Sequence, residues 1–220
     1  MAWTDHVTRQ EARYRDGLAR LPDDIDARQR QLTRVANAAL GAGFAQLMDG
    51  NGDQARTWLL EAASRYRESY EGAPKESWGR MIGAVKLRLI AGDSVGARAD
   101  AEWTLANGAA GAESPIGWYA ACVAQLVLGE DAEAAKLATG LVEAPEGFPA
   151  DVAAALQALA TGDAASYGSA IGSVVRSFET RAEHLEDVPI ADTALMLNVL
   201  ASERDLALEL VSPLVPTGSR

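Results

Sequence analysis

Three glycine turns, each followed by an alanine, divide the middle of the chain into segments with a helical period. Gly50, Gly92 and Gly129 lie 42 and 37 residues apart, and a fourth turn begins 33 residues later at Gly162. An alanine follows each of the first three glycines after five residues. Glycine ends helices because it adopts the left-handed conformation without a steric penalty, and an acidic residue after it caps the next helix. The pattern predicts antiparallel helical hairpins.

Apolar residues recur at intervals of three and four along most of the chain, which is the period of a helix. We expect helices over residues 5–20, 23–49, 53–70, 75–90, 94–107, 116–128, 132–143, 149–160, 164–185 and 190–201, and a short extended tail over 206–216. Residues 94–107 alternate in polarity, but their alanines favour helix over strand. The predicted fold class is therefore all-α, with about nine to ten helices stacked as antiparallel hairpins.

Two further features indicate how these helices pack. Gly41 and Gly43 fall inside an expected helix, where we expect them to let a neighbouring helix approach closely. Residues 116–128 are apolar on nearly every side, so we expect this helix at the centre of the domain. Its length of about thirteen residues is less than the roughly twenty needed to cross a bilayer, so we expect no membrane partner.

The most complete repeat unit surrounds the turn at Gly129. Its positions are Trp118, Cys122, Gly129, Ala134, Ala138 and Pro145. They resemble the tetratricopeptide-type repeat, whose first helix carries a tryptophan and a small residue and whose second helix carries alanine. The resemblance covers roughly residues 35–145 and implies a compact tetratricopeptide-like bundle or short solenoid.

The same resemblance implies which positions line the concave groove of the stack. These positions are Asn37, Leu40, Phe44, Met48, Ile82, Lys86, Leu89, Tyr119, Val123 and Val127. Because they are almost all apolar, an open groove would be a partner site, with Phe44, Met48, Lys86 and Tyr119 as candidate contacts. The alternative, which we favour, is that an N-terminal or C-terminal helix of the same chain fills the groove.

The C-terminal part carries a second resemblance. It rests on the run from Thr161 to Tyr167, the long helix after it, residues 190–195 and 200–201, and the tail 212–216. This layout is similar to the closing region of the helical-repeat immunity proteins (family forty-nine) of bacterial polymorphic toxin systems. The resemblance implies a protein partner, a toxin domain, which the chain would bind and block.

Charge and cysteine content limit the other partners. The 220-residue chain has 31 acidic and 20 basic residues, a net charge of −11, which disfavours nucleic acid and anionic lipid. Cys122 is the one cysteine, so no internal disulfide forms, and residues 1–17 contain acids and no apolar run. We expect a cytoplasmic protein.

The sequence carries no recognisable catalytic or metal-binding motif. His6 and His184 are far apart, and Cys122 lies in the most apolar helix, where a core role is expected. Residues 49–53 begin like a calcium loop, but Gln54 and Leu60 occupy the positions that require glycine and glutamate, so a hairpin turn with Asp53 as N-cap is expected. We predict no catalytic residue, no metal and no cofactor.

The chain has five tryptophans, more than a core of this size ordinarily needs. Trp3 and Trp78, near helix starts, are candidate exposed anchors for a partner.

We expect one α-helical repeat domain over 1–220, with an N-terminal helix (1–22), hairpin repeats (23–145), C-terminal helices (146–205) and an extended tail (206–220). The predicted function is a non-enzymatic protein–protein interaction module, a scaffold or a toxin-neutralising protein, with a homodimer as a further option. The alternative is an enzyme of unknown chemistry with a cleft of Arg and Asp/Glu residues.

Overall fold

The computed structural model describes residues 2–144 and 147–217, and these are helical with no strand. The α-helices are α1 (Trp3–Ala19), α2 (Ile25–Met48), α3 (Gly52–Tyr70), α4 (Trp78–Ile90), α5 (Ser94–Ala106), α6 (Pro115–Leu128), α7 (Asp131–Glu143), α8 (Ala150–Thr161), α9 (Ala164–Glu179) and α10 (Asp192–Ser202), with 3-10 turns η1 (Ala109–Gly111) and η2 (Leu185–Asp187). The predicted all-α class is confirmed. Pro145 of the best repeat unit and residues 218–220 of the expected tail lie outside the described residues.

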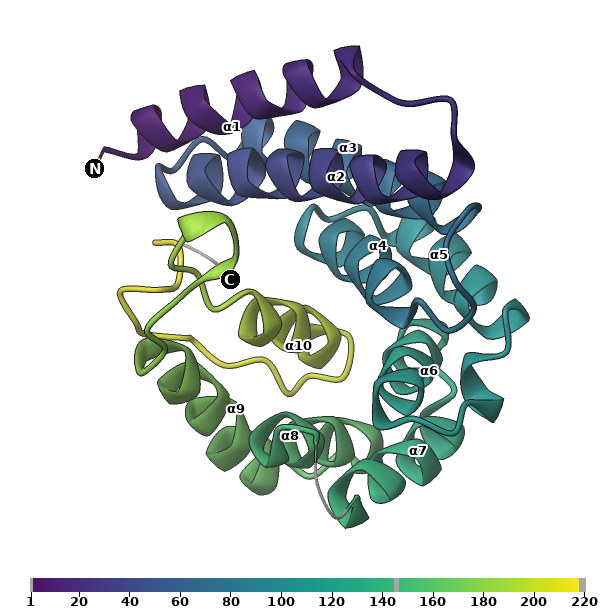
Figure 1. Cartoon of the computed structure of the whole chain (residues 1–220). Helices are drawn as coiled ribbons and strands as arrows, with labels where there is room; N and C mark the ends of the chain where they lie inside the picture. Colours follow the sequence, from purple (N-terminus) through teal and green to yellow (C-terminus); the bar gives the residue numbers. More distant parts are fainter. Residues whose placement is uncertain (1, 145–146, 218–220) are drawn as a thin grey trace.

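Helices α1 to α9 follow one another around a ring, and α10 lies inside it with part of the C-terminal tail (Figure 1). The four glycine turns connect α2 to α3, α4 to α5, α6 to α7 and α8 to α9. Gly50, Gly92, Gly129 and Gly162 have φ of 82°, 68°, 80° and 69°, so each has the predicted left-handed conformation. The ring is therefore built from four consecutive helical hairpins, preceded by α1.

Acidic side chains cap two of the second helices as expected. Asp93 accepts a hydrogen bond from the Gly96 N–H at 3.0 Å, and Asp163 accepts from the backbone at the start of α9. The prediction for Asp53 is wrong, because α3 begins at Gly52 and its N-cap residue is Asn51. No side-chain hydrogen bond caps that helix.

The glycines inside α2 lie where two helices approach closely. A Cβ atom added to Gly43 would lie 2.8 Å from Leu59 Cδ2 of α3, and one added to Gly41 would lie 2.9 Å from Gln10 Cδ of α1. Non-bonded carbon atoms do not approach one another this closely, so a side chain at either glycine would clash with the neighbouring helix. The expected use of these glycines is confirmed.

The centre of the ring is filled by the chain's own C-terminal helix. Ala194, Met196, Leu197 and Leu200 of α10 are fully buried. The expectation that residues 116–128 form the central helix is wrong, because α6 belongs to the ring and α10 takes the centre (Figure 1). Helix α6 is nevertheless buried along most of its length, from Tyr119 to Leu126, although Ile116 at its start is exposed. The groove is therefore occupied from within, as we favoured, and the occupant is the C-terminal helix.

One predicted helix is too long. We expected a helix over 164–185, but α9 ends at Glu179, with Thr180 as its C-cap residue. Phe178 is the last buried residue of α9, and the polar residues after it offer no apolar side to bury. Glu186 and Asp187, within the irregular turn η2, have φ of 56° and 58°, which a continuing right-handed α-helix does not accommodate. This break lets η2 turn back onto α2.

Within the described residues no helix combines the length and the apolar character that crossing a membrane requires.

Candidate functional site

The predicted partner contacts are mostly not on the surface. Phe44, Trp78 and Tyr119 are 1%, 4% and 8% exposed, so none of them is the protruding contact for a protein partner that we expected. The turn η2 packs against α2, and the Phe148 ring lies 5.2 Å from the ring of Tyr119. The chain's own C-terminal half thus covers the positions that an open groove would have offered.

The prediction that Trp78 is an exposed anchor is wrong. We expected an exposed anchor because it lies at a helix start, but the first turn of α6 covers its indole. A Cβ added to Gly117 would lie 3.0 Å from Trp78 Nε1. The other expected anchor, Trp3, is partly buried, with its ring 5.7 Å from the ring of His6. Met48 is also partly buried.

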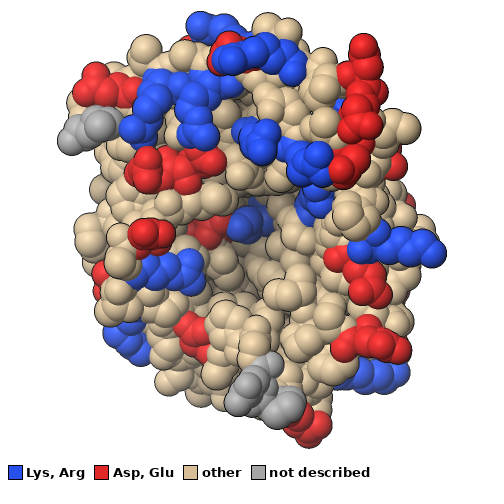
Figure 2. All heavy atoms as spheres, viewed as in Figure 1, with Lys and Arg blue, Asp and Glu red and all other residues tan. Residues whose placement is uncertain are grey.

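Lys86 faces the inside of the ring, where it pairs with Asp192 at the start of α10. The two side chains are 14% and 12% exposed. Figure 2 shows one face of the molecule, which is hollowed near its centre, with basic and acidic atoms inside the hollow. Lys86 therefore holds the helix that fills the groove and is not a free contact for a partner.

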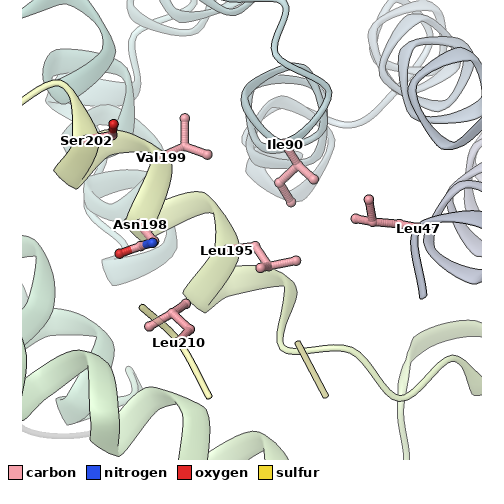
Figure 3. A pocket seen from close by; sticks show the side chains of 7 residues that line it. All are labelled: Leu47, Ile90, Leu195, Asn198, Val199, Ser202 and Leu210. Carbon is pink, nitrogen blue, oxygen red and sulfur yellow. The ribbon is translucent and has the colours of Figure 1, made fainter. Parts of the chain in front are cut away.

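A pocket of about 310 Å³ remains between the filling helix and the ring. Figure 3 shows its lining side chains, which come from the ends of α2 and α4, from α10 and from the tail. They are Leu47, Ile90, Leu195, Asn198, Val199, Ser202 and Leu210. Five of them are aliphatic, and Asn198 and Ser202 contribute an amide and a hydroxyl. This composition is typical of sites that bind an apolar group and orient it with a few polar atoms.

Asn198 fixes the wall of this pocket. Its side-chain amide donates to the Leu208 carbonyl at 2.9 Å, and its carbonyl oxygen accepts from the Leu208 N–H at 3.0 Å. The two bonds attach the extended tail to α10 in one register, so that Leu210 reaches the pocket. The helical period alone did not predict the pocket, although Asn198, a polar residue within an apolar helix, was a detectable signal.

A second pocket, of about 250 Å³, lies beside the Lys86–Asp192 pair. Arg181, Glu183 and His184 line it, and the Arg181 guanidinium lies 3.5 Å from the centroid of the Phe178 ring. We expected His184 to lie at the end of a helix over 164–185. Helix α9 ends before it, so His184 lies in the loop that leads into η2.

Cys122 has the environment of a core residue. It is fully buried, and its thiol donates to the Ala134 carbonyl at 3.5 Å. Burial raises the pKa of the thiol to about 12, so the nucleophilic thiolate is scarce near neutral pH. In the described part of the chain, no three His, Cys, Asp or Glu residues are grouped so that they could hold a metal ion.

The fold and the pocket define an all-α protein of helical hairpins closed on its own C-terminal helix. Comparison of the chain with protein-family models, with curated proteins and with solved structures gave no match.

Proposed function

We propose that the protein is a non-enzymatic protein–protein interaction module of tetratricopeptide-like type, which acts in the cytoplasm. The observation that carries the proposal is the apolar pocket formed by Leu47, Ile90, Leu195, Val199 and Leu210. Its volume of about 310 Å³ suits a large apolar side chain of a partner, and such anchors carry most of the affinity of protein interfaces.

The proposed partner is a toxin domain that the protein neutralises. Two features support this proposal. Part of the resemblance to immunity proteins falls on α10 and the tail, at residues 190–195 and 212–216, and these elements supply Leu195, Asn198, Val199 and Leu210 to the pocket. A filled groove also makes the module rigid, which lowers the entropy cost of binding.

The test is co-expression with the product of the neighbouring gene, followed by measurement of a stoichiometric complex. Val199→Arg places a charge in the pocket and should weaken the complex at least about tenfold, because a buried guanidinium would have no partner there. Val95→Arg is the matched control, since Val95 is 81% exposed on α5, outside the pocket. Equal affinity of the two variants would contradict the proposed site.

A further inference from the structure

A third pocket, of about 540 Å³, opens where the first turns of α4 and α6 lie side by side. Tyr66, Ser77, Trp78, Arg80, Ser114 and Ile116 line it. None of them belongs to the pocket beside α10.

The electrostatic feature of this pocket is a guanidinium without a carboxylate. Arg80 Nε donates to Ser69 Oγ at 3.1 Å and Nη2 donates to Gln29 Oε1, and both acceptors are neutral. Among the described residues, every other partly buried arginine has a carboxylate partner. These are Arg9, Arg28, Arg65, Arg67, Arg88 and Arg204.

Arg88 lies on the same helix as Arg80 but has carboxylate partners. Arg88 pairs with both Asp93 and Asp100, and these carboxylates help to hold the pKa of its guanidinium above the ordinary value although burial lowers it. Burial lowers the pKa of Arg80, and no carboxylate offsets this. Although the chain has 31 acidic residues, none of them pairs with the partly buried Arg80 guanidinium, which therefore keeps N–H donors without a partner.

Other donors meet at the same place. Ser114 Oγ accepts from the Gly117 N–H at 3.2 Å, which leaves its hydroxyl hydrogen free to donate into the pocket. The indole N–H of Trp78 lies nearby without an acceptor in the described structure, but it is buried beneath the first turn of α6 and offers no donor at the pocket surface. The first turns of α4 and α6 add two positive dipole ends to the same wall, although most of their N–H groups already donate to Glu76, Ser77 and Ser114.

The pocket also has an apolar side. The Trp78 and Tyr66 rings and the Ile116 side chain line it, and its volume exceeds what an inorganic ion would fill. Glu76 lines it too, but this residue is exposed and forms no ion pair with Arg80. The fitting ligand therefore joins an anionic oxygen group to an apolar body.

We propose that this pocket binds a small organic anion, with a carboxylate or phosphate group on Arg80 and Ser114 and an apolar body against Trp78 and Ile116. The site is separate from the proposed partner pocket, because the two share no residue.

The test is titration of the isotope-labelled protein with benzoate, phenyl phosphate and inorganic phosphate, followed by the tryptophan indole and backbone N–H signals. Benzoate or phenyl phosphate should shift the signals of Trp78, Gly79 and Gly117 in a saturable way, whereas neutral benzamide should not. A response to benzoate alone supports a carboxylate ligand, and a response to phenyl phosphate with or without inorganic phosphate supports a phosphate ligand. Responses to both aromatic anions support a site that accepts either group.

Arg80→Gln should weaken binding at least about tenfold, because it removes the charge that pairs with the anion. Arg176→Gln is the charge-matched control and should change affinity less than about twofold, since Arg176 is exposed on α9 and also lacks a carboxylate. If Arg80→Gln fails to fold, Arg80→Lys keeps the charge but loses the planar fork and should still weaken binding. The proposal is overturned if no aromatic anion gives a saturable shift, if benzamide binds equally well, or if the folded Arg80 variant binds as tightly as the wild type.

Discussion

Lys86 of α4 and Asp192 of α10 form an ion pair across the inside of the ring, although they lie 106 positions apart in the sequence. Both side chains are largely shielded from water, so their attraction is screened less than that of a surface pair. Asp192 is also in the first turn of α10, where a negative charge is stabilised by the helix dipole. The pair therefore sets where the filling helix begins and how it faces the ring.

Lys86→Met should destabilise the protein by about 3 kcal/mol, because Asp192 would stay buried without a counter-charge. Lys136→Met is the matched control: Lys136 pairs with Glu133 at 2.6 Å, but its side chain is 70% exposed. Loss of that surface pair should cost less than about 1 kcal/mol. Urea denaturation measures both, and equal losses would show that the inner pair does not hold α10.

The tail is expected to depend on Asn198. Asn198→Ala removes both hydrogen bonds to Leu208 and should cost about 1–2 kcal/mol. Hydrogen exchange at the Leu208 N–H should become faster, because the tail would leave α10 while the ring stays folded. In Asn107→Ala, which removes an exposed amide that donates to the Trp103 carbonyl at 2.8 Å, exchange at Leu208 should not change. Unchanged exchange at Leu208 in Asn198→Ala would show that these two hydrogen bonds do not hold the tail against α10.

The turn at Gly129 should tolerate no side chain without strain. Gly129 has φ of 80°, and a Cβ added there would meet no atom within 4 Å, so the whole cost comes from the backbone. We expect Gly129→Ala to destabilise by about 1 kcal/mol and Gly129→Val by more. Gly52→Ala is the control, since its Cβ also meets nothing and its φ is not positive. Thermal unfolding should separate the two alanine variants, and the hypothesis of a strained turn fails if they melt together.

The glycine turns and the helical period were sufficient to predict the helices, because both signals are local. They were not sufficient to predict what lies in the groove. Phe44 and Tyr119 have the same apolar character whether a partner or α10 covers them, so exposure depended on a long-range contact that no local pattern encodes. Trp78 was misplaced for the same reason, since α6 covers it. The pocket around Asn198 depends on the pairing of the tail with α10, which periodicity does not address.

Cys122 is expected to be unreactive in the folded protein. With a thiol pKa raised to about 12 by burial, and with no exposed surface, it should react with a thiol reagent at neutral pH only after unfolding. Cys122→Asp should prevent folding, because the carboxylate would be buried without a counter-charge, whereas Cys122→Ser should fold at modest cost. Rapid labelling of the native protein, or a folded Cys122→Asp variant, would show that α6 is not in the core.

Acid is expected to weaken the docking of α1 through His6. This residue is 8% exposed, and its Nδ1 accepts a hydrogen bond from Arg9 at 2.9 Å, which requires a neutral ring. Burial, and then the charge of Arg9, lower the pKa of His6 below its ordinary value, although Asp187 and Asp5 act in the opposite direction. Because the folded pKa is the lower one, the stability that neutral His6 contributes is present above about pH 6.5 and is lost as the pH falls through the folded pKa. The melting temperature should therefore fall between about pH 7.5 and pH 5.5, and it should fall less in His6→Gln, which cannot take up a proton. Identical pH dependence in the two proteins would mean that protonation of His6 is not linked to folding.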